Sequence, residues 1–237
     1  MNFRTITRQF LLESVEEDIT KLRVLDFDDT LAHTVEKVRV ETPTGPKHIS
    51  SDEYASYTLG PGEYFDKDDI AFKEFSKIDI DSATPVPLVS DLFKRFVDAK
   101  GSRKVLILTA RDQIVKPWVM KFLEERLGIE NPEDKVDFVG VGSPLPGEKV
   151  KIIAKYINEN PTITTVSFYD DSHKNTRAVK EYILYLNSER EKESLPDIYS
   201  DIATVVHNDD GTVELERLKQ ESIGPRTLTR DFLIKFN

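Results

Sequence analysis

Short apolar runs alternate with stretches of helical periodicity through most of this chain, and this alternation restricts its fold more than any other feature. The run at 105–109 is apolar enough to lie buried on both faces of a parallel sheet. Further predicted strands are 22–27, 136–139, 165–169 and 203–206. Helical periodicity lies between them at 88–99, 113–127, 149–159 and 174–190. The order predicts an α/β fold with a Rossmann-like parallel sheet flanked by helices, and ligands at the carboxyl ends of its strands.

Residues 33–84 interrupt this alternation directly after the first predicted strand. Val35–Val40 and Lys47–Ile49 flank the turn-forming sequence Thr42–Pro46, which predicts a short hairpin. The sequence that follows is acidic and contains many aromatic residues. An insert at this point would lie over the strand ends, either as a cap that covers a site or as a peripheral decoration.

The composition excludes several kinds of site. The chain has no cysteine, which excludes disulfides, thiolate zinc sites, iron–sulfur clusters and cysteine nucleophiles. It has four histidines, none paired at i and i+4, so any metal is expected on oxygen ligands. The net charge of −10 argues against sequence-independent wrapping of nucleic acid. No apolar stretch is long enough to span a membrane and no signal-peptide pattern is present, so we expect a cytoplasmic protein.

Four polar stretches follow predicted strands or begin predicted helices: Asp26-Phe27-Asp28-Asp29-Thr30, Thr109-Ala110-Arg111, Lys149, and Asp170-Asp171 with Asn175. Alternate residues of an extended chain share a face, so Asp26 and Asp28 are expected to point together into the crevice. Two carboxylates placed in this way suit a division of labour between a nucleophile and a proton donor.

The other three stretches suit phosphate and metal binding. Thr109 and Ala110 offer a hydroxyl and backbone N–H groups to an anion, and Lys149 adds a cation at the positive end of a helix. Asp170 and Asp171 are hard oxygen ligands of the kind that hold Mg²⁺. Each stretch alone has a plainer explanation as a turn, a helix cap or a solvated lysine. Together they are predicted to lie along one edge of the sheet.

The order and spacing of these stretches resemble the haloacid dehalogenase superfamily of phosphotransferases over residues 20–210. The motif Asp-x-Asp-x-Thr-Leu matches Asp26, Asp28, Thr30 and Leu31. The remaining matches are the strand that ends in Thr109, the lysine at a helix start, and the acidic motif Asp170-Asp171 with Asn175. Lys149 fits the lysine position best, and Lys151 is the alternative.

The resemblance implies a phosphatase. Asp26 would attack phosphorus and form an aspartyl-phosphate, and Asp28 would protonate the leaving oxygen and later deprotonate the hydrolytic water. The Asp26 side chain, the Asp28 main-chain carbonyl and Asp170 would hold Mg²⁺, with Asp171 supporting them. Thr109 and Lys149 would stabilise the phosphoryl oxygens. Asp29 stands where the family commonly has glycine, and this difference is not expected to abolish activity.

The two ends of the chain repeat one motif. Arg4–Leu12 recurs as Arg226–Ile234 with six of nine positions identical. We therefore separate the segments 1–19 and 222–237 from a predicted phosphatase domain at 20–221, in which 33–84 is the cap insert. The copies are interpreted as docking peptides for a protein assembly, as segments that pack on each other or on a neighbouring subunit, or as remnants of a duplication.

The N-terminal copy, with Glu13 after it, also resembles the capsid-targeting leaders of internal proteins in some large tailed phages. A phage protein of this kind would be found in the host cytoplasm or in the virion. A mitochondrial presequence is a rival interpretation, but the acidic cluster at Glu13–Asp18 leaves it too short. The C-terminal copy lacks the glutamate, which argues against cleavage there.

Two classes of function follow from these patterns. The first is a Mg²⁺-dependent phosphatase acting on a small phosphorylated substrate, with a nucleotide or a 3′-phosphorylated nucleic acid end as candidates. Residues 60–81 carry seven acidic and three basic side chains, which would repel a polyanion unless Arg111, Lys116 and Lys121 form a compensating patch. The second class is a virion- or scaffold-associated protein whose phosphatase activity is secondary or absent.

Overall fold

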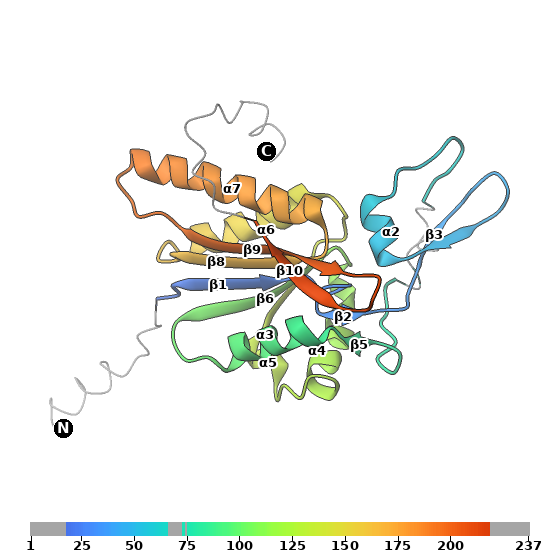
Figure 1. The fold of residues 1–237 in the computed structure, drawn as a ribbon, viewed down its shortest axis with the longest axis horizontal. Helices are drawn as coiled ribbons and strands as arrows, with labels where there is room; N and C mark the ends of the chain where they lie inside the picture. Colours follow the sequence, from blue (N-terminus) through green and yellow to red (C-terminus); the bar gives the residue numbers. More distant parts are fainter. Residues whose placement is uncertain (1–17, 66–72, 74, 219–237) are drawn as a thin grey trace, which may run out of the picture.

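A six-stranded, mainly parallel sheet forms the centre of the protein (Figure 1). The computed structural model describes residues 18–65, 73 and 75–218. In spatial order the strands are β10 (Val213–Arg217), β9 (Tyr199–His207), β8 (Thr165–Asp170), β1 (Lys21–Leu25), β6 (Arg103–Thr109) and β7 (Asp137–Gly140). All neighbouring pairs are parallel except β9 and β10, which are antiparallel. The predicted α/β class with a Rossmann-like sheet is confirmed.

The central strand β1 lies where the strand order reverses. The chain leaves β1 for β6 and β7 on one side, and later returns to β8 and β9 on the other side. Leu25 pairs with Ile107 of β6 and with Tyr169 of β8, so the three strands are in register at their carboxyl ends. In open α/β sheets such a switch point is where a ligand-binding crevice forms.

Helices cover both faces of the sheet. Figure 1 shows α3 (Pro87–Asp98), α4 (Lys116–Glu125) and α5 (Pro132–Lys135) on one face, and α6 (Pro146–Glu159) and α7 (His173–Lys192) on the other. The side chains of β6 alternate between the two hydrophobic clusters, with Val105 and Ile107 in one and Leu106 and Leu108 in the other. This strand is buried on both faces, as its apolar sequence predicts.

The segment between β1 and α3 forms a small body beyond one end of the sheet (Figure 1). Its ends are joined by the two-residue strands β2 (Ala32–His33) and β5 (Thr84–Pro85), which pair antiparallel. The predicted hairpin is present as β3 (Val38–Val40) and β4 (Lys47–Ile49), followed by α2 (Ser51–Ser56). Val38, Val40, Ile49 and Phe75 form a separate hydrophobic cluster in this insert.

Some element boundaries differ from the sequence prediction. The helix expected at 113–127 is a 3-10 turn, η1 (Gln113–Val115), followed by α4, because the Asp112 side chain accepts the Ile114 N–H and caps the turn. Helix α6 begins at Pro146, which places Lys149 inside its first turn. Strand β10 was not predicted, since its sequence is polar and half exposed at the sheet edge.

Within the described ranges, no helix combines the length and apolar character needed to cross a membrane. Both copies of the terminal repeat, Arg4–Leu12 and Arg226–Ile234, lie outside these ranges.

Candidate active site

The predicted site residues meet at the carboxyl ends of β1, β6 and β8 and at the first turn of α6. A small cavity of about 30 Å³ lies between them. Its walls include Asp26, Asp28, Thr109, Ala110, Lys149, Asp171 and Asn175. Asp170 contacts Lys149 directly. The structure therefore brings residues from all four sequence stretches together around one cavity. Their roles in catalysis and binding stay predictions.

The chain turns sharply after β1 and thereby presents both aspartates to this cavity. The Asp26 N–H donates to the Tyr169 carbonyl at 2.9 Å, which extends the strand by one residue. The Phe27 carbonyl then accepts the N–H groups of Leu31 and Ala32, both at 2.9 Å. Asp29 has a φ of +50°, in the left-handed region that glycine adopts most easily.

Lys149 lies between two of the carboxylates. Its Nζ is 2.7 Å from Asp170 Oδ2 and 3.0 Å from Asp26 Oδ2, and the residue is only 2% exposed. Lys151 instead pairs with Glu148 at 3.1 Å on the exposed face of the helix. Of the two candidate lysines, Lys149 is therefore the one whose charge reaches the cavity.

Two further groups fix the orientation of Asp170. The Asn175 side-chain amide donates to both oxygens of Asp170, at 2.9 and 3.1 Å. The Ser172 N–H donates to Oδ1 at 2.9 Å. The Thr30 hydroxyl meanwhile accepts the Asp171 N–H at 2.9 Å, which ties the turn after β1 to the end of β8. The acidic motif is thus held in place from both neighbouring elements.

Asp26, Asp170 and Asp171 each offer a carboxylate oxygen, and these oxygens lie within 4.8 Å of one another. Burial raises the pKa of Asp26 to about 7, with Asp170 and Asp28 adding to the rise and Lys149 opposing it. Burial raises the pKa of Asp171 well above its ordinary value, and the charges of Asp170, Asp26 and Asp29 add to the rise. Three close carboxylates that share the cation of Lys149 leave excess buried negative charge. A hard divalent cation such as Mg²⁺ fits both this charge and this donor set.

Asp28 has different surroundings. Arg111 donates to it through Nε, at 2.9 Å from Oδ2, and through Nη2, at 2.8 Å from Oδ1. The Thr34 hydroxyl donates to Oδ1 at 2.7 Å. Burial alone would raise the pKa of Asp28, but the Arg111 charge and these hydrogen bonds outweigh it and hold the pKa below its ordinary value. The Asp28 side chain is therefore ionised and engaged with Arg111, outside the group of three carboxylates.

Arg111 also joins the insert to the sheet domain. Its Nη2 is 3.1 Å from Glu36, and its Nη1 donates to the backbone carbonyls of Phe75 and Lys77, both at 2.8 Å. The guanidinium lies 4.0 Å from the centre of the Phe75 ring. No sequence motif indicates this role, because these partners are distant along the chain.

The basic patch suggested for Arg111, Lys116 and Lys121 is wrong. Arg111 is 1% exposed and fully engaged in the contacts described above. Lys116 pairs with Glu133 at 2.8 Å, and Lys121 pairs with Glu125 at 3.7 Å. Nearby acidic side chains therefore compensate these charges, and no patch for a polyanion results from them.

Three of the four histidines line a second cavity of about 430 Å³ on the Asp171 side of the site. The rings of His33 and His207 are 4.8 Å apart, and His33 Nδ1 is 3.1 Å from Asp29 Oδ1. His173, the first residue of α7, completes the set. Spacing along the sequence could not reveal this grouping, because the three histidines come from three separate elements.

Scans against protein-family models, curated proteins and solved structures found no match for this chain. The resemblance to the haloacid dehalogenase superfamily therefore rests on the motif residues alone.

Proposed function

We propose that the protein is a phosphate monoester hydrolase that depends on a divalent cation and uses Asp26 as its nucleophile. One observation supports this above the others. Asp26 and Asp28 end the central strand at the switch point of the sheet, and their surroundings shift their pKa values in opposite directions. Paired carboxylates with separated pKa values are typical of sites where one group acts on the reacting atom and the other handles protons.

In the first step, an Asp26 oxygen attacks phosphorus while the bond from phosphorus to the leaving oxygen breaks. The leaving oxygen takes a proton from Asp28. In the second step, water attacks the phosphorus of the aspartyl-phosphate and gives its proton to Asp28, which releases inorganic phosphate and restores Asp26. Lys149 and the Thr109 hydroxyl stabilise the charge on the transferring phosphoryl oxygens.

Asp28 can donate a proton only if its pKa rises from the value that Arg111 imposes. A phosphate group that enters the cavity beside Ala110 and Arg111 competes for the guanidinium. When the hydrogen bonds from Arg111 weaken, burial dominates and the pKa of Asp28 rises. Substrate binding thereby prepares the proton donor.

Asp26, Asp170 and Asp171 would hold the cation, together with the main-chain carbonyl of Asp28 that the family resemblance implies. A divalent cation, when bound, would supply positive charge to the phosphoryl oxygens and would favour the ionised form of Asp26 at neutral pH. Asp26 must be ionised to act as the nucleophile.

Phosphate release by the purified chain tests this proposal. The substrates are nucleoside monophosphates, a sugar phosphate and a 3′-phosphorylated oligonucleotide, each with Mg²⁺ or with EDTA. Asp26→Asn should lower turnover at least about a thousand-fold, because it removes the nucleophile and keeps the side-chain shape. Asp98→Asn, at an exposed position at the end of α3, is the matched control and should retain turnover. Full activity of Asp26→Asn, or equal activity in EDTA, would overturn the proposal.

The second class of function, attachment to a virion or scaffold through the terminal repeats, stays a prediction. Removal of residues 1–13 and 226–237 together should abolish co-purification with an assembly and leave phosphatase activity intact. Unchanged co-purification would remove the case for docking.

A further inference from the structure

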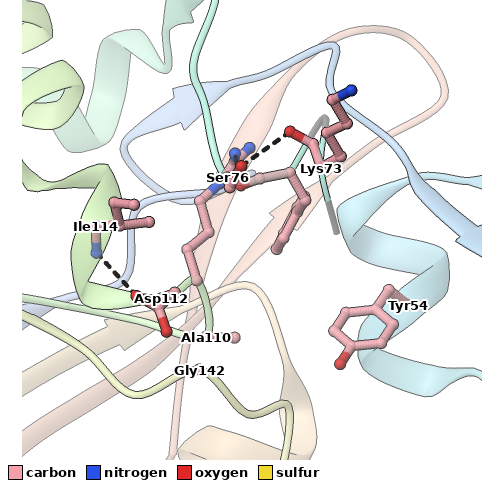
Figure 2. Close-up of a pocket in the computed structure, with 9 residues that line it drawn as sticks. Tyr54, Lys73, Ser76, Ala110, Asp112, Ile114 and Gly142 are labelled. Carbon is pink, nitrogen blue, oxygen red and sulfur yellow. Dashed lines mark hydrogen bonds between the residues drawn. The ribbon is translucent and has the colours of Figure 1, made fainter. Parts of the chain in front are cut away.

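A cavity beside the reaction site lies between the insert and the sheet domain (Figure 2). Its volume is about 440 Å³, within the range of about 300–1,000 Å³ typical of small-molecule sites. It shares Tyr54, Phe75 and Ala110 with the reaction-site cavity. The reaction-site cavity, at about 30 Å³, has no room for a leaving group. The leaving group must therefore extend into a neighbouring cavity.

The chemistry of proton transfer selects this cavity over the histidine-lined one. The leaving oxygen must face Asp28, which protonates it. Arg111, which donates to both oxygens of Asp28, lines this cavity together with Ala110, the neighbour of Thr109, whose hydroxyl lies 3.5 Å from Asp28 Oδ2. The histidine-lined cavity reaches Asp28 only through the Thr34 hydroxyl on Oδ1 and otherwise opens on Asp29 and Asp171. A leaving group that points towards Asp28 therefore enters the cavity between the insert and the sheet domain.

The walls of this cavity are suited to a flat ring. Figure 2 shows Tyr54, from α2, on one side of it and Ile114, with Asp112, on the opposite side, while Ala110 and Gly142 lie between them. The Phe75 ring packs against Tyr54, with a centroid distance of 6.1 Å. Ile114 is a large apolar residue that is nonetheless 59% exposed. An aromatic ring on one wall and an exposed isoleucine on the other offer apolar contacts to a planar group.

Polar groups at the cavity edge suit the edge of such a ring. Asp112 Oδ1 accepts the Ile114 N–H at 2.9 Å, and its Oδ2 lies next to Gly142. A carboxylate at this place accepts hydrogen bonds from N–H or O–H donors of a ligand. Lys73 also lines the cavity. A cavity of about 440 Å³ has room for one nucleoside and not for a chain of nucleotides.

We infer that this cavity is the leaving-group subsite and that it receives a nucleoside, so that the substrate is a single nucleoside monophosphate and not a polynucleotide end. The inference rests on the proposed phosphatase function. The base would contact the walls formed by Tyr54 and Ile114. The protein would therefore recognise the base of the leaving group and not its sugar.

The test compares kcat/KM for nucleoside monophosphates and for ribose 5-phosphate, which lacks the base, using the full chain with Mg²⁺. The best nucleotide should be preferred by at least about tenfold, since base stacking on one aromatic side chain has an effect of this order. Ile114→Ser and Tyr54→Leu should each lower this preference about three- to tenfold. Leu195→Ser, a similarly exposed apolar residue in the loop before β9, should leave the preference unchanged.

The outcomes separate the two claims. Equal kcat/KM for nucleotides and ribose 5-phosphate, with turnover still lost in Asp26→Asn, would overturn the nucleoside subsite and leave the phosphatase in place. A preference for 3′-phosphorylated oligonucleotides that weakens as salt rises would also overturn it, in favour of backbone recognition. Absence of turnover on every substrate would overturn the phosphatase and the subsite together.

Discussion

Asp26 and Asp28 are two residues apart on one strand end, yet they belong to two charge groups with opposite properties. The Lys149 group consists of Asp26, Asp170, Asp171 and Lys149, and the Arg111 group consists of Asp28, Glu36 and Arg111. In the first group three carboxylates share one cation and the pKa of Asp26 rises to about 7. In the second group the pKa of Asp28 falls below its ordinary value. Neighbouring charges and hydrogen bonds, and not burial itself, therefore decide which aspartate is ionised.

The two groups also differ in what they can still bind. Arg111 uses its remaining donors on the backbone carbonyls of Phe75 and Lys77, so its hydrogen bonds are made within the protein until a substrate phosphate competes for them. The Lys149 group keeps excess buried negative charge. It is therefore the group that an added cation would stabilise.

After loss of the nucleophile Asp26 itself, removal of the Lys149 charge should have the largest effect. Lys149→Met should lower kcat/KM about a hundred- to a thousand-fold, because a buried cation that stabilises the phosphoryl oxygens is lost. The matched variant is Lys151→Met, two residues further along α6, which removes an exposed charge paired with Glu148 and should change activity less than about twofold. Steady-state phosphate release measures both, and Lys149→Arg shows whether charge alone restores activity. Equal losses in the two methionine variants would contradict the assignment of Lys149 to the site.

Loss of the Arg111 charge should next affect stability. Arg111→Met leaves Asp28 and Glu36 buried without their cation and releases the insert from the sheet domain, so we expect a loss of about 3–5 kcal/mol in the free energy of unfolding. Urea denaturation measures it. Arg177→Met, which breaks an exposed ion pair with Glu181, is the control and should cost less than about 1 kcal/mol. Similar losses in the two variants would show that the buried Arg111 contacts are not important for stability.

The sequence predicts the repetitive parts of this protein well. The apolar run at 105–109 and its shorter counterparts identify five of the six strands, because a buried parallel strand must be apolar on both faces. The sixth, β10, has a polar edge sequence that resembles a loop. The four polar stretches all reach one edge of the sheet, since the carboxyl ends of parallel strands meet there.

Contacts between distant elements could not be predicted in the same way. Arg111 resembles a surface charge in the sequence, but the turn after β1 places Asp28 against it and the insert adds Glu36. The grouping of His33 with His207 likewise depends on the contact between the His207 ring, at the end of β9, and the Asp29 carbonyl in the turn after β1. Pairs of this kind depend on tertiary packing, which no local spacing encodes.

The binding of Mg²⁺ should depend on pH through the Lys149 group. The pKa of Asp26 is raised from its ordinary 3.8 to about 7, so between these values the metal-free folded protein holds a proton that the unfolded chain lacks. Its stability should therefore fall as pH rises from about 4 to about 7. Mg²⁺ requires the ionised carboxylate, so its apparent affinity should rise by up to about tenfold per pH unit over the upper part of this range.

Thermal unfolding with Mg²⁺ or EDTA at about pH 5.5 and about pH 8 measures this coupling. The rise in Tm caused by Mg²⁺ should be clearly larger at the higher pH. Asp26→Asn should remove most of the difference, because it cannot ionise. The same rise in Tm at both pH values would mean that the cation does not bind through Asp26.

Asp29 follows Asp28 in the turn after β1 and should have the smallest effect. Its φ of +50° favours glycine, so Asp29→Gly relieves backbone strain of about 1 kcal/mol. The same change removes the acceptor for the Ser51 hydroxyl, at 2.7 Å, which ties α2 of the insert to the turn after β1. These opposing changes should leave the free energy of unfolding within about 1 kcal/mol of the original. Asp29→Asn, which tolerates the left-handed backbone and keeps an acceptor, is the control.

Activity should distinguish the two ways in which Asp29 touches the site. The Asp29 carboxylate is one of the charges that raise the pKa of Asp171, so both variants should lower that pKa and strengthen Mg²⁺ binding slightly at low pH. Only Asp29→Gly also loses the tether to Ser51. A higher KM in Asp29→Gly alone would therefore report a looser insert, whereas a similar change in both variants would report the charge. A loss of kcat greater than about tenfold in both Asp29→Gly and Asp29→Asn would instead assign Asp29 to the Lys149 group. That result would contradict the division of the site into the two groups as defined above.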